Sequence, residues 1–200
     1  VASTARKEFS PSELGVPVAE ERLSLARWQR KATVERVLDG LWTLPIEQVL
    51  VVVARIEQHL ARAGTGMPVA RRMTSAQVRQ MHLAGVEIGA HSVRHPNLTL
   101  ESPAVVREEM RSSRALLERL CDAPINGFAY PAGWKNADAE AAAAEAGFRY
   151  AVATTRGVND RNALNLFSLA RVGMPDTGVS DLKRALSTAR QIPGPGSAAS

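Results

Sequence analysis

Apolar residues recur every three or four positions in two stretches of the first third of the chain, which predicts two helices there. The first covers about residues 19–38 and stops at an Asp-Gly pair, and the second covers about residues 45–63 and stops at a Gly-Thr-Gly sequence. Residues 1–18 are rich in Ser, Pro and charge, so we expect an irregular lead-in. Residues 1–72 are therefore predicted to be a lead-in followed by a helical hairpin.

After residue 72 the pattern switches repeatedly between helical spacing and short apolar runs. In the longest helix Val106 and Met110 are expected to face inward, with arginines and glutamates outward. Alternating strands and helices indicate parallel strands covered by helices, in a barrel or barrel-like α/β sheet over residues 73–192. Residues 193–200 are expected to be a loose tail. The expected helices are 74–84, 102–120, 138–146 and 179–191, and the expected strands are 86–90, 126–133 with its loop, 148–154 and 166–174.

Composition narrows the possible classes of protein. The single cysteine, Cys121, excludes an internal disulfide framework and a cysteine-based zinc cluster. No apolar run approaches the 18 or so residues of a membrane span, so no transmembrane segment is predicted. The net charge of +5 would suit nucleic acid, but the arginines are scattered beside glutamates and only 4% of residues are aromatic. We therefore do not expect nucleic-acid binding.

Two of the four histidines, His91 and His95, stand at the end of the expected strand 86–90. The carboxyl ends of parallel strands often hold site residues, because the strand is rigid and the following loop is free to vary. Histidines spaced in this way can both bind one zinc ion, and Gly89 would allow close backbone approach. A pair four residues apart is also common by chance and supplies only two ligands. A second motif is needed to decide between these readings.

The second motif is FAYPAG at residues 128–133, again at the end of an expected strand. A Tyr-Pro-x-Gly turn has a rigid first half and a permissive last residue, so its backbone N–H groups can point toward a ligand. Trp134 follows directly, and its ring could line a sugar subsite. Alone the motif predicts only a turn, but its spacing from the histidines is informative.

Together, His91-Ser92-Val93-Arg94-His95-Pro96 and residues 128–133 resemble the second and third motifs of the polysaccharide deacetylases of the NodB-homology family. The resemblance covers about residues 73–175. It implies a partial, distorted (β/α) barrel with an N-terminal helical insert, and a divalent metal, commonly zinc, that His91 and His95 would bind. It also implies hydrolysis of N- or O-acetyl groups on an amino-sugar polymer or oligosaccharide.

The resemblance assigns roles to several further residues. The backbone N–H of Ala132 matches the donor that stabilises the oxyanion, while Tyr130, Pro131, Trp134 and Arg171 are expected to contact substrate. In such a site a carboxylate removes the proton of the attacking water, and an acid protonates the leaving group.

The chain departs from the family pattern in two ways. The first motif of the family, an Asp-Asp-Gly that supplies the base and the third metal ligand, does not occur in these 200 residues. Asp39-Gly40 is the nearest imitation, and we reject it because it ends a helix and has one carboxylate. In the late Leu-x-His motif the acid is replaced by Arg171, which cannot donate a proton near neutral pH.

Two explanations follow for these departures. Either the full protein has an upstream segment with the Asp-Asp strand, or the chain is a non-catalytic carbohydrate-binding relative. We favour the first explanation and expect this chain alone to be inactive. Of the other candidates, His59 and His82 are expected to face solvent on helices, Asp138 to cap its helix, and Glu87 to be structural.

Overall fold

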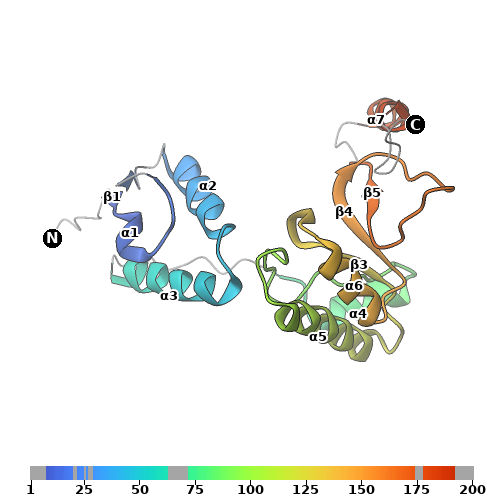
Figure 1. Cartoon of the computed structure of the whole chain (residues 1–200), viewed down its shortest axis with the longest axis horizontal. Coiled ribbons are helices and arrows are strands. Elements are labelled where there is room, and N and C mark those ends of the chain that lie inside the picture. Colours follow the sequence, from blue (N-terminus) through green and yellow to red (C-terminus); the bar gives the residue numbers. More distant parts are fainter. Residues whose placement is uncertain are drawn as a thin grey trace. The chain divides into compact units, whose positions relative to one another are not determined.

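The computed structural model describes residues 8–19, 22–24, 26, 29–62, 72–173 and 178–191 (Figure 1). The chain divides into two compact units, Val1–Arg72 and Met73–Ser200. The elements of the first unit are β1 (Glu8–Phe9), α1 (Pro11–Leu14), β2 (Leu23–Ser24), α2 (Arg30–Leu41) and α3 (Ile46–Arg62). Those of the second unit are α4 (Ser75–Leu83), α5 (Pro103–Cys121), β3 (Gly127–Ala129), η1 (Pro131–Gly133), α6 (Ala137–Glu145), β4 (Tyr150–Arg156), β5 (Leu169–Arg171) and α7 (Val179–Gln191).

The first unit corrects two expectations. The described part of the lead-in, from residue 8 on, is not wholly irregular, because β1 pairs antiparallel with β2, with Phe9 opposite Leu23, and α1 follows. The helix expected over residues 19–38 does not begin near residue 19 but at Arg30, as α2. Leu23 is only 1% exposed and packs in one small core with Phe9 and with Val52 of α3. The residues before Arg30 have only a weak helical pattern. Burial of Leu23 in this core stabilises the strand pairing more than their helix propensity would stabilise a helix.

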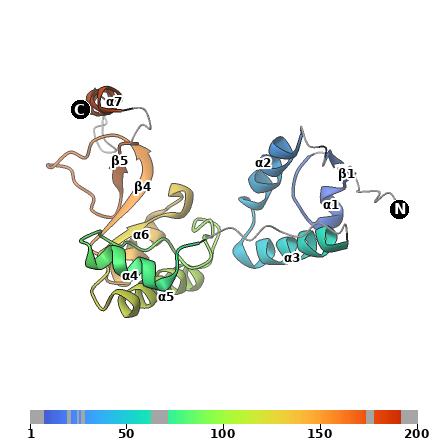
Figure 2. The ribbon, with the colours of Figure 1, turned by 180° about the vertical axis from the view of Figure 1, so that it is seen from behind.

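The second unit confirms the predicted α/β class with a parallel sheet. Its three strands lie in the order β3-β4-β5, and both pairings are parallel. The helices pack in sequence, α6 against β4, α5 against α6 and α4 against α5 (Figures 1 and 2). The structure shows this sheet as open over the part of the chain that it describes.

Three helices of this unit begin at side-chain caps that hold otherwise unpaired N–H groups. Thr74 forms a capping box with Gln77 at the start of α4, and Ser102 caps α5 with Pro103 in its first turn. The cap of α6 is Asn136, which accepts from the Ala139 N–H at 2.9 Å. The expectation that Asp138 is the cap is therefore wrong, since Asp138 already lies inside the first turn.

Aromatic rings and small side chains form the core of the second unit. Phe128 is 1% exposed, and its ring centroid lies 5.4 Å from that of Tyr130 and 5.2 Å from that of Phe148. The alanines of α6 that face β4 are buried, which lets this helix approach the sheet closely. Cys121, at the end of α5, is 4% exposed and belongs to the same core.

The expected strand 86–90 is reduced to a single parallel bridge between Ala90 and Phe128. Gly85, at φ 87°, ends α4, and the Val86 N–H completes this helix cap by donating to the Met81 carbonyl. Val86 is consequently 44% exposed and does not pair as a strand residue. Close approach at Gly89 is confirmed, because a Cβ there would lie 3.2 Å from the Gly127 carbonyl oxygen.

Candidate functional site

The Ala90 bridge places His91 beside the end of β3. The Nδ1 of His91 lies 2.7 Å from the carbonyl oxygen of Ala129, the last residue of β3. A carbonyl oxygen can only accept, so Nδ1 carries a proton, and in the neutral form of the ring the lone pair is on Nε2. This is the arrangement found in most metal-binding histidines, whose second nitrogen donates to a protein oxygen. The two motifs predicted to form one site are thus joined by a direct hydrogen bond.

His95 lies next to His91, with ring centroids 4.8 Å apart in an edge-on arrangement. Its backbone is in the left-handed region at φ 60°, as is that of Ser92 at φ 61°. The His95 N–H donates to Ser92 Oγ at 3.0 Å, which closes a tight turn between the two left-handed residues. Burial lowers the pKa of His95 below its ordinary value of 6.5, and the adjacent His91 ring lowers this pKa further.

Glu109 of α5 lies where its sequence pattern did not predict it. It was expected to face solvent, but its side chain is 2% exposed and points at the histidine loop. Its Oε2 accepts from the backbone N–H groups of Val93 and Arg94 at 2.8 and 2.9 Å, and its Oε1 accepts from the Arg94 Nε at 2.6 Å. No sequence signal marks it, because its partners are backbone groups of a loop that α5 reaches only in the fold.

The cost of the left-handed backbone and the free energy of the hydrogen bonds to Glu109 are of comparable size. Each left-handed non-glycine residue costs about 1–3 kcal/mol. Each hydrogen bond to a charged group contributes about 1.5–3 kcal/mol. The three bonds to Glu109 are therefore large enough to offset the strain at Ser92 and His95.

The turn after β3 holds the expected oxyanion donor. Ala132 is exposed, and its φ of 50° is left-handed, so η1 is a kinked turn and not a regular helix. Thr154 of β4 fixes the turn by donating from Oγ1 to the Ala132 carbonyl oxygen at 3.2 Å. This bond holds the peptide between Ala132 and Gly133 against β4, at the carboxyl end of the sheet, and the Ala132 N–H belongs to the peptide before it.

Replacing Gly133 with alanine should destabilise this turn. Gly133 has a φ of 80°, and an added Cβ would lie 2.7 Å from the Thr154 backbone nitrogen. We expect G133A to lower the free energy of unfolding by about 1–3 kcal/mol, because it adds both strain and overpacking. Urea denaturation would measure this, with G173A as the control, since among the described residues no non-neighbouring atom lies within 4 Å of a Cβ added there. Equal stability of the two variants would contradict the placement of η1 against β4.

The other expected substrate contacts divide into two groups. Tyr130 is 0% exposed and donates from its hydroxyl to the Phe167 carbonyl oxygen at 2.9 Å, and Pro131 is fully buried. These two side chains are core residues, so the expectation that they contact substrate is corrected. Burial also raises the pKa of the Tyr130 phenol. Trp134 is half-buried beside η1, and Arg171 is exposed at the end of β5, with Nε donating to the Ala153 carbonyl at 2.6 Å.

The remaining candidates lie in other surroundings. His59 is half-buried with its ring centroid 6.3 Å from that of Phe9, so it does not simply face solvent, and His82 is half-buried on α4. Glu87 accepts from the Tyr150 hydroxyl at 2.6 Å, which raises the pKa of that phenol to about 12. Asp39 lies within α2, in agreement with our rejection of the Asp39-Gly40 pair.

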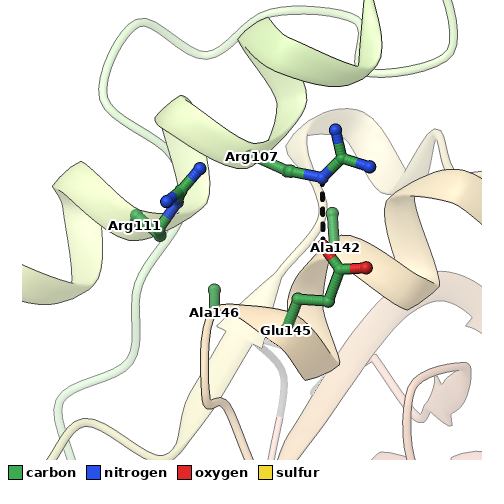
Figure 3. Close-up of a pocket in the computed structure, with 5 residues that line it drawn as sticks. All are labelled: Arg107, Arg111, Ala142, Glu145 and Ala146. Carbon is green, nitrogen blue, oxygen red and sulfur yellow. Dashed lines mark hydrogen bonds and ion pairs between the residues drawn. The ribbon is translucent and has the colours of Figure 1, made fainter.

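A hollow of about 210 Å³ lies between α5 and α6 (Figure 3). Its lining includes Arg111 and the ion pair between Arg107 Nε and Glu145 Oε2, which are 3.0 Å apart. Figure 3 shows the Arg107 and Glu145 side chains reaching toward each other from the two helices. None of the predicted site residues lines it, so this hollow is a helix-packing groove away from the histidines.

The residues at the histidine loop fit part of a metal site. His91 and His95 supply two neighbouring imidazoles, one of which is already oriented by the Ala129 carbonyl. A four-coordinate zinc site takes three protein ligands and leaves one position open. Over the described ranges of the chain, no three His, Cys, Asp or Glu side chains lie close enough together to hold a metal ion. The described part of the loop therefore offers two imidazoles, one fewer than the three protein ligands of such a site.

The pKa of His95 can be tested directly. In the metal-free protein we expect a proton NMR titration of the His95 ring to have its midpoint below 6.5. H91A should move the midpoint upward, because the His91 ring contributes to the shift. The unfolded chain binds a proton more readily than the folded chain here, so this group costs stability as pH falls below about 6.5. A midpoint at or above 6.5 would contradict the partial desolvation of this ring.

Comparison with known proteins gives a consistent set of relatives. The family described as "Polysaccharide deacetylase" matches residues 31–151. YxkH of Bacillus subtilis, named for the polysaccharide deacetylases, is 27% identical over 100 residues, which are 50% of this chain and 36% of YxkH.

Solved structures show the same similarity. The deacetylase PplD of Streptococcus pyogenes, solved in complex with acetate, matches with a TM-score of 0.55 and 28% identity over 60% of this chain and 53% of PplD. A polysaccharide deacetylase of Bacillus cereus shares the fold, with a TM-score of 0.51 and 17% identity over 60% of this chain and 38% of that protein. The chain thus spans 36% of the length of YxkH and 53% of that of PplD.

Proposed function

Because this chain belongs to the polysaccharide deacetylase family, we propose that it forms part of a metal-dependent hydrolase that removes N- or O-acetyl groups from a carbohydrate. The observation that supports this most is the hydrogen bond between His91 Nδ1 and the Ala129 carbonyl. It brings the histidine pair and the turn with Ala132 to the same end of the sheet.

The chain's own residues have separate tasks in this proposal. His91, through Nε2, and His95 would hold a divalent ion such as zinc, which when bound supplies a Lewis acid for an acyl carbonyl. The Ala132 N–H would donate to the oxygen that becomes negative when water adds to the acetyl group. Trp134 and Arg171 are proposed to contact the sugar, Trp134 through its ring face and Arg171 through its guanidinium.

The reaction also needs a carboxylate that acts as base. A longer form of the protein with an Asp-Asp strand would supply this group and the third metal ligand. The alternative is a non-catalytic carbohydrate-binding protein, which is favoured by Arg171 at the position of the family's acid and by the absence of a three-ligand cluster over the described residues. The similarity to PplD, a deacetylase solved in complex with acetate, favours the hydrolase.

Acetate release distinguishes the two functions. The longest form of the protein that its reading frame encodes would be incubated with acetylated chitooligosaccharides, with chelator, and with zinc added back. Acetate release that chelator stops, zinc restores and H95A removes would support the hydrolase. Binding of the oligosaccharides without acetate release under any of these conditions would support the carbohydrate-binding alternative.

A further inference from the structure

We propose that Glu109 is the positioning residue of the histidine loop, defined as residues 91–95, and that metal affinity at His91 and His95 depends on its carboxylate. The inference rests on the proposed function, because it concerns the same pair of histidines. Glu109 does not touch the rings themselves, and it acts through the backbone between them.

The first argument is where the carboxylate binds. Its two backbone partners, the N–H groups of Val93 and Arg94, lie midway between the two histidines in sequence. They also lie between the two left-handed residues, Ser92 and His95. Consecutive N–H groups in such a turn point to one side and form a concavity that binds an anion. In this protein the anion is a side chain of α5, so the loop conformation is tied to a rigid helix.

The second argument is how the contacts of this loop divide. The His91 ring is held by the Ala129 carbonyl at the end of β3. Inside the loop the Ser92 hydroxyl accepts from the His95 N–H. The carboxylate of Glu109 adds the contact that ties the middle of the turn to α5. Loss of this contact would release the turn from the helix and let the second imidazole shift relative to the first.

The third argument is the choice of residue. A buried carboxylate and its partner often contribute no more to stability than well-packed apolar residues of the same size. The neighbouring inward residues of α5, Val106 and Met110, are apolar and nearly fully buried. A charged residue among them is therefore better explained by the geometry it imposes on the loop than by the stability of the core.

The test compares three variants with the native chain. E109A removes all three hydrogen bonds, whereas E109Q keeps an oxygen that can accept from Val93 and Arg94 but cannot pair with the guanidinium of Arg94. S113A is the matched control, because Ser113 is equally buried one turn further along α5 and bonds only within the helix, to the Met110 carbonyl. Circular dichroism and urea denaturation would define conditions under which each variant is folded.

Two measurements are made under those conditions: amide hydrogen exchange at Val93 and Arg94, and zinc affinity followed by the NMR signals of the His91 and His95 rings. We expect E109A to exchange these amides faster and to bind zinc about 10-fold or more weakly, as for loss of an outer-shell partner. E109Q should fall between E109A and the native chain, and S113A should match the native chain. A role in core stability alone would lower the urea midpoint and leave the zinc affinity of the folded fraction unchanged.

The proposal would be overturned if folded E109A had the same amide exchange rates at Val93 and Arg94, and the same zinc affinity, as the native chain. If E109A does not fold, E109Q decides, and native zinc affinity in E109Q together with an unchanged ring-signal response would overturn it. If zinc leaves both ring signals of the native chain unchanged, the proposed metal site fails. In that case faster exchange at Val93 and Arg94 in the variants still supports the role of Glu109 in the loop, and unchanged exchange removes it.

Discussion

F128A is expected to lower the free energy of unfolding of the second unit by about 3–5 kcal/mol, the cost of emptying a fully packed aromatic site. The Phe128 ring contacts both Tyr130 and Phe148, and its backbone pairs with Ala151 on one side and Ala90 on the other. Removing the ring leaves a cavity that β3 and β4 cannot fill without breaking these pairings. Urea denaturation followed by far-ultraviolet circular dichroism measures the effect.

The control for this variant is L116A. Leu116 is on α5 of the same unit but is 54% exposed, so its truncation should change stability by less than about 1 kcal/mol. A loss in F128A no larger than that in L116A would show that Phe128 is not the centre of the core. Because Ala90 pairs with Phe128, F128A should also disturb the His91 ring signal, whereas L116A should not.

H91A is expected to weaken zinc binding by about 100-fold or more, since loss of an outer-shell partner alone costs 10–100-fold. The His91 ring is held by the Ala129 carbonyl, so this imidazole is oriented before an ion binds. Isothermal titration calorimetry with zinc measures the affinity. H82A is the control on α4, and it should bind zinc as the native chain does.

A second variant separates the ligand from its hydrogen bond. In H91N the side-chain amide can still donate to the Ala129 carbonyl but offers no imidazole. We expect H91N and H91A to lose zinc binding equally, while H91A alone loses the stability of that hydrogen bond, about 0.5–1.5 kcal/mol. Zinc binding by either variant at native affinity would exclude His91 as a ligand.

Those features of the fold that depend on local sequence were predictable. The helices beginning near residues 75 and 103 have their caps and prolines in sequence, and the structure starts α4 and α5 there. The spacing of the two motifs also predicted that they share one site, and the His91–Ala129 bond joins them. What the sequence could not show was set by packing between distant segments. Glu109 reads as a polar helix residue, and only the backbone of the histidine loop makes it an inward one.

Contacts between separate segments also explain why the predictions for residues 86–90 and for Tyr130 were wrong. The alternation at residues 86–90 predicted a strand, but the first of these residues is used to end α4. Tyrosine is a residue type that often contacts sugars, so Tyr130 was expected to do so. Its hydroxyl instead donates a hydrogen bond to the Phe167 carbonyl in the loop before β5. In both cases a hydrogen bond to a backbone carbonyl determined the structure. For Val86 the carbonyl is in the preceding helix, and for Tyr130 it lies 37 residues further along the chain.

The burial of Cys121 gives this protein a reporter of its own motions. Its thiol lies in the core at the end of α5, and the sequence contains no other cysteine. Alkylating reagents can reach it only when that end of the helix separates from the core, so the labelling rate measures the frequency of such openings. Mass spectrometry after timed exposure to iodoacetamide would therefore rank core variants by local opening without any introduced probe.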